Sequence, residues 1–228
     1  MTDSDGRASV GSAGIGMCRF IHTADLHIGM PASGLGEAGP KVRAARLESL
    51  AKILEIAAGA DAHALLIAGD VFDDNQVDAG LVEKVAGLFN DQTRIPIYII
   101  PGNHDPYTRD SVYRRPAWGQ LREHVHVLTA AEPIELAEAV TLYPCPLERR
   151  KGADDPTRWI PPHGGERIRV GMAHGSMAIR PDVGDDDFPI PLDAAERKGL
   201  DYLALGHWHS QLGHPCGEPQ ARTWYCGT

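Results

Sequence analysis

The sequence has no run of eighteen consecutive apolar residues, which argues against a membrane-spanning helix. Residues 1–17 are rich in Gly, Ser and Asp and lack the apolar h-region of a signal peptide, so we predict a flexible tail there. The 4 cysteines lie far apart and form no C-x-x-C pair. Without a secretory signal, this usage predicts reduced thiols in a cytoplasmic protein.

Positive charge is also scarce. Lys and Arg number 22 against 31 Asp and Glu, and the net charge is −9. This balance argues against a broad basic surface that would bind DNA tightly without sequence preference. The clusters 114–115 and 149–151 are interpreted as solvated loop charges. The length of 228 residues and the 43% apolar content suit one globular domain, which we place at residues 18–228.

The apolar pattern predicts an α/β domain with a parallel core, because strands and helices alternate over the first hundred residues. Continuous apolar runs indicate strands at 20–24, 64–68, 95–100, 125–128, 139–143, 168–173 and 202–205. Helical spacing of apolar residues indicates helices at 41–57, 79–90 and 192–198.

Metal-ligand residue types follow the carboxyl ends of five predicted strands. In chain order they are Asp25 and His27, Asp70 and Asp73, Asn103 and His104, His174, and His207 and His209. Open α/β sheets bind ligands at the carboxyl ends of their strands, so we expect these side chains to converge on one site. Any one of these motifs is a weak signal, whereas five in order, each after a strand, form a specific one.

These residue types suit two metal ions. Carboxylates, imidazoles and an amide oxygen accommodate Mn²⁺, Fe or Zn²⁺, whereas a structural zinc site favours thiolates. About eight candidate ligands exceed the needs of one ion and fit two ions about 3.5–4 Å apart that share a carboxylate. Such a pair activates water and holds phosphoryl oxygens, so the sequence predicts a metal-dependent phosphoesterase.

At these residues the chain resembles the calcineurin-like metallophosphoesterase superfamily. The shared motifs run from about Arg19 to Ser210, in the order Asp25-Leu26-His27, Gly69-Asp70-Val71-Phe72-Asp73, Gly102-Asn103-His104-Asp105, His174-Gly175 and Gly206-His207-Trp208-His209. The resemblance implies an α/β fold of four layers, an α/β/β/α sandwich in which helices flank two facing mixed β-sheets.

The resemblance also implies a role for each position. One metal is expected on Asp25, His27, Asp70 and His209, and the second on Asp70, Asn103, His174 and His207, so that Asp70 bridges the pair. His104 is expected to contact the phosphate and protonate the leaving oxygen. Asp73 is expected to orient His104, and Asp105 to cap the loop.

Within the superfamily, residues 20–29 and 68–73 resemble the SbcD-type DNA repair exonucleases. This branch implies a Mn²⁺-dependent nuclease subunit of the double-strand-break repair complex, acting on DNA phosphodiesters beside an SMC-like ATPase. Its members continue past the last motif into a DNA-contacting cap and an ATPase-binding segment. Since the sequence stops at Thr228, we expect either a truncated chain or a short member without the cap.

Two other functions remain open. The acidic charge and the absent cap favour a small-molecule or cyclic-nucleotide phosphoesterase on the same core. A scaffold subunit for an SMC-like ATPase is the third possibility, although an intact ligand set without metal would be costly to bury. Trp208 is interpreted as either a pocket wall or a packing residue, and the run 185–187 as a hydrated acidic loop.

Overall fold

The structure, a computed structural model, describes residues 18–31, 33–92, 94–162, 167–178, 187–215 and 221–227. The tail predicted at residues 1–17 lies outside this part of the chain, and the single domain over 18–228 stays a prediction. No helix among the described residues is long and apolar enough to cross a membrane.

The first sheet is parallel and has the strand order β1-β2-β3-β4. Its strands are β1 (Phe20–Thr23), β2 (Ala64–Ala68), β3 (Ile97–Ile100) and β4 (Val125–Val127). The 3₁₀ helix η1 (Ser33–Ala38) and the helix α1 (Gly39–Gly59) connect β1 to β2, and α2 (Ala79–Asp91) connects β2 to β3. The short 3₁₀ helices η2 (Val112–Arg114) and η3 (Pro116–Gln120) precede β4.

The second sheet is mixed and has the order β5-β6-β7-β8-β10-β9. Its strands are β5 (Ile134–Ala137), β6 (Val140–Cys145), β7 (Ile168–His174), β8 (Tyr202–Gly206), β9 (Leu212–His214) and β10 (Thr223–Tyr225). The strands β6, β7, β8 and β10 run parallel, while β5 and β9 pair antiparallel to their neighbours. The helix α3 (Ala194–Lys198) leads into β8.

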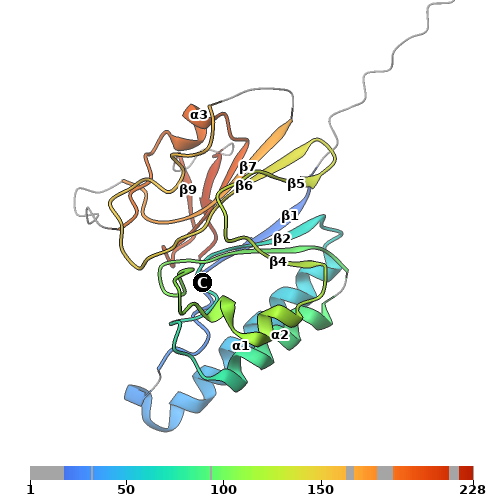
Figure 1. Cartoon of the computed structure of the whole chain (residues 1–228), viewed down its shortest axis with the longest axis vertical. Coiled ribbons are helices and arrows are strands. Elements are labelled where there is room, and N and C mark those ends of the chain that lie inside the picture. Colours follow the sequence, from blue (N-terminus) through green and yellow to red (C-terminus); the bar gives the residue numbers. More distant parts are fainter. Residues whose placement is uncertain are drawn as a thin grey trace, which may run out of the picture.

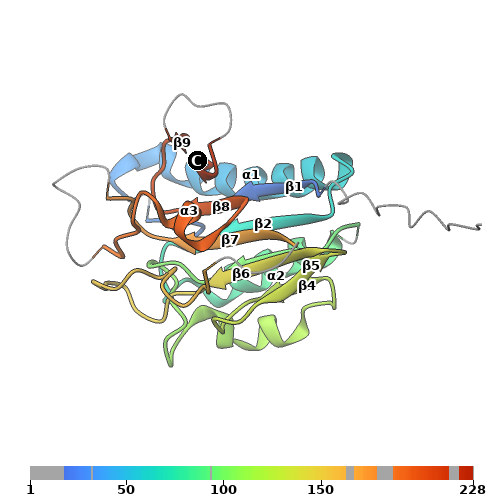
Figure 2. The ribbon, with the colours of Figure 1, turned by 90° about the horizontal axis from the view of Figure 1, so that it is seen from above.

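The two sheets face each other across a shared apolar layer. Alternate residues of β2 separate the layers, since Leu65 and Ile67 pack beneath α1 and α2 while Leu66 packs against the second sheet. A third cluster, with Leu203 and α3's Ala194, covers the other face of the second sheet. Figure 1 shows α1 and α2 below the first sheet and α3 beyond the second, and Figure 2 gives the same ribbon seen from above. The predicted four-layer α/β sandwich is therefore confirmed.

The element boundaries differ from the predicted ones at several points. The strand predicted at 95–100 begins at Ile97, and the helix predicted from Lys41 begins at Gly39 because Pro40 lies in its first turn, where a missing N–H costs nothing. The strands β5, β9 and β10 were not predicted from the sequence. Each has only three or four residues.

Candidate active site

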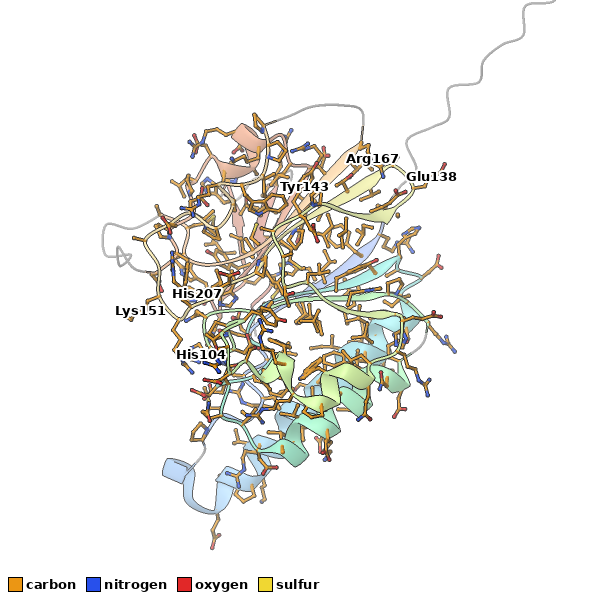
Figure 3. The ribbon with its side chains drawn as sticks, in the orientation of Figure 1. His104, Glu138, Tyr143, Lys151, Arg167 and His207 are labelled. Atoms are coloured by element: carbon orange, nitrogen blue, oxygen red, sulfur yellow. The ribbon has the colours of Figure 1, made fainter. Side chains whose placement is uncertain are left out.

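Loops after β1, β2, β3, β7 and β8 meet at one end of the sandwich. The loops after β1 and β2 continue to pair beyond their strands, since the Asp25 amide donates to the Gly69 carbonyl and the His27 amide to the Asp70 carbonyl, both at 3.1 Å. Figure 3 shows His104 and His207 together at this end, with Glu138 and Arg167 at the opposite end. The structure thus brings together all nine side chains singled out in the sequence.

The backbone at this end is held in an uncommon conformation. Four residues have positive φ, namely Asp25 (56°), His27 (44°), Asp70 (55°) and His207 (105°). Non-glycine residues rarely adopt such angles, and those that do cluster at functional sites where the surrounding fold imposes them. All four residues contribute side chains to the shared site.

The first group of possible metal ligands is Asp25, His27 and His209. Their nearest ligand atoms all lie within 4.8 Å of one another, and the Nε2 atoms of His27 and His209 are 3.1 Å apart. The Asp25 carboxylate also accepts the main-chain N–H of His207 at 2.9 and 3.0 Å, which fixes the carboxylate between the two sheets.

The second group is Asn103, His174 and His207. The Oδ1 atom of Asn103 lies 2.8 Å from His174 Nε2 and 3.1 Å from His207 Nδ1. His174 is fully buried, and its Nδ1 donates to the Ala68 carbonyl at 2.8 Å. That bond leaves the Nε2 lone pair of a neutral His174 directed into the site.

Asp70 lies between the two groups. Its Oδ2 is 3.8 Å from His27 Nε2 and 3.3 Å from His174 Nε2, and its Oδ1 accepts the His104 amide at 2.9 Å. Burial alone would raise the pKa of Asp70, but the charge and hydrogen bond of His174 outweigh it and lower that pKa to about 2. Asp70 is therefore a carboxylate placed to touch both ligand groups.

The charge balance of this end fits divalent cations. Burial favours neutral His174, yet the charge and hydrogen bond of Asp70, together with the Asp25 charge, raise the pKa of His174 to about 9. The proton on His174 thus supplies positive charge that a bound cation would otherwise supply to balance the negative charge of the buried carboxylates. Two adjoining groups of oxygen and imidazole nitrogen donors around one shared carboxylate are the arrangement of a binuclear site.

His104 projects beside these groups and is partly exposed, with 39% of its side chain accessible. Its Nδ1 lies 2.9 Å from the Asp73 carbonyl oxygen, so Nδ1 donates and Nε2 faces outward. The Asp73 carboxylate is 3.9 Å from His104 Nδ1 but 3.2 Å from His27 Nδ1. The expected orienting contact to His104 is thus made by the main chain of Asp73, while its side chain lies beside His27.

The comparisons with known proteins agree with this geometry. Residues 18–211 match the family described as calcineurin-like phosphoesterase. The chain belongs to the calcineurin-like phosphoesterase family. With its buried His and Asp groups, this makes it a metal-dependent phosphoesterase.

The curated relatives of this phosphoesterase include two bacterial proteins. The uncharacterized metallophosphoesterase YhaO of Bacillus subtilis is 26% identical over 89% of this chain and 53% of its own length. A subunit of nuclease SbcCD from Rhodobacter capsulatus is 36% identical over 40% of this chain and 22% of its own length. The chain therefore spans about half or less of the relatives that it matches. A solved structure, TT1561 of Thermus thermophilus, superposes with a TM-score of 0.49 and 11% identity over 91% of this chain and 88% of its own.

Asp105 ties together two site loops of the phosphoesterase. It is fully buried, and its carboxylate accepts the Gly102 amide at 2.8 Å, the Phe72 amide at 3.0 Å and the Tyr113 hydroxyl at 2.6 Å. Burial, with the nearby Asp70 charge, raises the pKa of Asp105 to about 6 against the effect of these donors. The expected loop-capping role thus takes the form of a clamp between the loops after β2 and β3.

Sequence reasoning missed one residue of the phosphoesterase site. Asp187, interpreted as part of a hydrated acidic loop, has its Oδ2 3.0 Å from His207 Nε2 and accepts the Ser176 hydroxyl at 2.5 Å. The other two aspartates of that run lie outside the described residues. The side chain of Trp208 packs against Tyr225, with ring centroids 5.2 Å apart and planes 10° apart, so the packing interpretation holds for it.

Proposed function

We propose that the chain is the catalytic core of a Mn²⁺-dependent phosphodiesterase that degrades DNA as an exonuclease. The observation that carries the proposal is the similarity to the nuclease SbcCD subunit of Rhodobacter capsulatus, at 36% identity over 95 residues, in a chain whose site supplies donors for two ions. By the same similarity, the whole protein is proposed to work beside an SMC-like ATPase.

The proposed ligands follow the two groups of the site. Asp25, His27 and His209 hold one ion, Asn103, His174 and His207 hold the other, and Asp70 contacts both. Two such ions supply an activated water and neutralise charge on the phosphoryl oxygens. The chain's own contribution is the buried, hydrogen-bonded frame that fixes these donors before substrate arrives.

His104 is proposed as the residue that contacts the scissile phosphate and protonates the leaving oxygen. Its Nδ1–H is fixed on the Asp73 carbonyl, so Nε2 is the atom available to substrate. When both ring nitrogens are protonated, Nε2–H donates to the phosphate and passes its proton to the departing alkoxide, leaving the neutral Nδ1–H tautomer. The Asp73 backbone and carboxylate are proposed to orient His104 and His27.

A small-molecule or cyclic-nucleotide phosphoesterase is the second candidate, and charge favours it. The net charge is −9, and the basic cluster that follows β6 is paired within the protein. Arg149 contacts Asp154 and Arg150 contacts Asp74, so neither guanidinium is fully available to bind a nucleic acid backbone. A small phosphodiester would need no extended positive surface.

Hydrolysis of three substrates with Mn²⁺ separates the candidates. The substrates are end-labelled linear duplex DNA, bis-nitrophenyl phosphate and nitrophenyl phosphate. The DNA proposal expects mononucleotide release and cleavage of the bis-ester over the monoester. Vigorous cleavage of the bis-ester with intact DNA would move the substrate to small phosphodiesters, and preference for the monoester would contradict a phosphodiesterase.

His104→Asn and His63→Gln form the matched pair of variants for this assay. His63 is exposed just before β2, at the opposite end of that strand from Asp70. We expect His104→Asn to lower kcat for DNA by about 10²–10⁴-fold, because it removes the proton donor, and His63→Gln to leave it unchanged. Equal activity of the two variants would contradict the role of His104.

A further inference from the structure

From the contacts of Asp187 we propose that this residue positions His207 for metal binding by fixing which ring nitrogen carries the proton. The inference rests on the proposed function, because it assumes that His207 holds an ion. It concerns a residue outside the five motifs, on the segment that leads into α3. Asp187 acts here through His207 and does not itself touch the substrate.

The hydrogen-bond network begins at Trp208, whose indole N–H is a donor only. Its Nε1 donates to Ser176 Oγ at 3.0 Å, and the ring is held in place by stacking on Tyr225. Tyr225 is itself fixed, because its buried hydroxyl donates to the Gly175 carbonyl at 2.7 Å and accepts the Met177 amide at 2.8 Å. The first donor of the network therefore has one orientation.

The direction of the next bonds follows from the chemistry of each group. An ionised carboxylate only accepts, so Ser176 Oγ, 2.5 Å from Asp187 Oδ2, must donate its own proton to that oxygen. The same oxygen lies 3.0 Å from His207 Nε2, which must also donate. His207 is therefore the Nε2–H tautomer when neutral.

The consequence lies at the other ring nitrogen. With the proton on Nε2, the lone pair of His207 is on Nδ1, which faces Asn103 Oδ1 at 3.1 Å inside the second ligand group. Without Asp187, the proton can move to Nδ1 and block that lone pair. A carboxylate on the far nitrogen also makes an imidazole a stronger ligand, as outer carboxylates do in metal proteins generally.

The backbone around Asp187 is built into the fold. Its carbonyl accepts the Ser176 amide at 3.2 Å, the next residue, Phe188, donates to the Gly152 carbonyl at 2.8 Å, and Ile190 donates to the Ser176 carbonyl at 2.8 Å. The Phe188 side chain is buried at 4% exposure. Asp187 thus reaches His207 from a segment whose main chain is hydrogen-bonded to both Ser176 and Gly152.

The test compares Asp187→Asn with Asp193→Asn. Asp193 is an exposed aspartate of the same segment, paired with Arg197. Mn²⁺ binding is titrated by electron paramagnetic resonance, and the tautomer of His207 is read from imidazole ¹⁵N shifts of the metal-free protein. We expect Asp187→Asn to weaken one of two Mn²⁺ sites by about 10–100-fold and to lose the Nε2–H tautomer, while Asp193→Asn changes neither.

Ser176→Ala adds a graded step, because it removes one of the donors that aim the Asp187 carboxylate. It should move both readouts in the same direction by less. An unchanged tautomer in Asp187→Asn, or equal loss of affinity in Asp193→Asn, overturns the inference while two Mn²⁺ ions still bind the wild type. Wild-type protein that binds no Mn²⁺ overturns the proposed function instead, and the tautomer measurement still decides the inference about Asp187.

Discussion

Removing the hydroxyl of Tyr113 tests whether Asp105 is the clamp between the loops after β2 and β3. The hydroxyl donates to Asp105 Oδ2 at 2.6 Å, and both residues are buried, at 6% and 0% exposure. Phenylalanine keeps the ring, which packs against Phe72 and Trp118 at centroid distances of 6.3 and 5.0 Å. Tyr113→Phe therefore removes one hydrogen bond and little else.

The magnitude follows from the charge of the acceptor. A hydrogen bond to a charged group contributes about 1.5–3 kcal/mol, whereas one between neutral groups contributes about 0.5–1.5 kcal/mol. In Tyr113→Phe the carboxylate keeps the amides of Gly102 and Phe72, so the loss is confined to one bond. We expect Tyr113→Phe to lower the free energy of unfolding by about 2 kcal/mol.

Two variants bracket this value in urea denaturation of the metal-free protein. Tyr202→Phe removes a neutral bond, from the hydroxyl to His22 Nδ1 at 3.2 Å, and should cost about 1 kcal/mol or less. Asp105→Ala leaves three buried donors without an acceptor. It should lower the free energy of unfolding by more than Tyr113→Phe does, by at least about 3 kcal/mol. A Tyr113→Phe cost no greater than that of Tyr202→Phe would refute the reasoning that a buried carboxylate clamps the loops.

Two further predictions concern protonation and metal. Burial lowers the pKa of His22 from 6.5 to about 4, so the unfolded chain binds a proton at this residue before the folded protein does. The free energy of unfolding is therefore unaffected by His22 above pH 6.5 and falls by up to about 3 kcal/mol as the pH is lowered toward 4. Unfolding of His22→Phe measured at pH 7.5 and 4.5 should show a smaller loss of stability on acidification than the wild type. An equal loss would contradict a neutral His22 in the native state. Excess Mn²⁺ should stabilise the wild type by about 2.7 kcal/mol for each bound ion at a hundred times its Kd. Thermal unfolding of Asp70→Asn should show much less stabilisation, because the shared carboxylate is gone. Equal stabilisation of both proteins would place the ions elsewhere.

The apolar pattern was enough to predict an α/β domain with a parallel core, because β2 and β3 are continuous apolar runs and α2 has a clear helical period. The four layers were implied by the resemblance to the family. Three ligand-bearing turns were also readable, since Asp70, Asn103 and His207 each stand next to a glycine at a strand end. The proposed metal roles of these residues stay predictions.

The remaining features depend on contacts that no local pattern encodes. Asp187 approaches His207 across 20 positions of sequence, from a segment without a strand or a motif, where an acidic run is typical of hydrated loops. Asp73 offers two kinds of acceptor, and only the backbone path decides that its carbonyl faces His104 while its carboxylate faces His27. Sequence spacing identifies Asp73 but leaves open which of its atoms act, and it does not identify Asp187.

Gly206 is a point where the two sheets approach closely beside the site, and its substitution tests that approach. A Cβ there would lie 2.1 Å from the Ala68 carbonyl oxygen, 2.8 Å from Ala24 Cβ and 2.8 Å from His174 Nδ1. The first of these is main chain of the opposite sheet, which cannot turn aside as a side chain does. We expect Gly206→Ala to destabilise the protein by about 3 kcal/mol or more and to weaken Mn²⁺ binding, because His174 bonds to that same Ala68 carbonyl.

Gly87→Ala is the matched control, since a Cβ at this position in α2 meets no atom within 4 Å. Alanine there should raise the free energy of unfolding by about 0.5–1 kcal/mol, because it reduces the conformational freedom of the unfolded chain. Opposite signs for the two glycines, with Mn²⁺ affinity lost only in Gly206→Ala, would tie the metal site to the spacing of the sheets. Destabilisation by Gly206→Ala with unchanged Mn²⁺ affinity would mean that the ligand loops hold their geometry without that close approach.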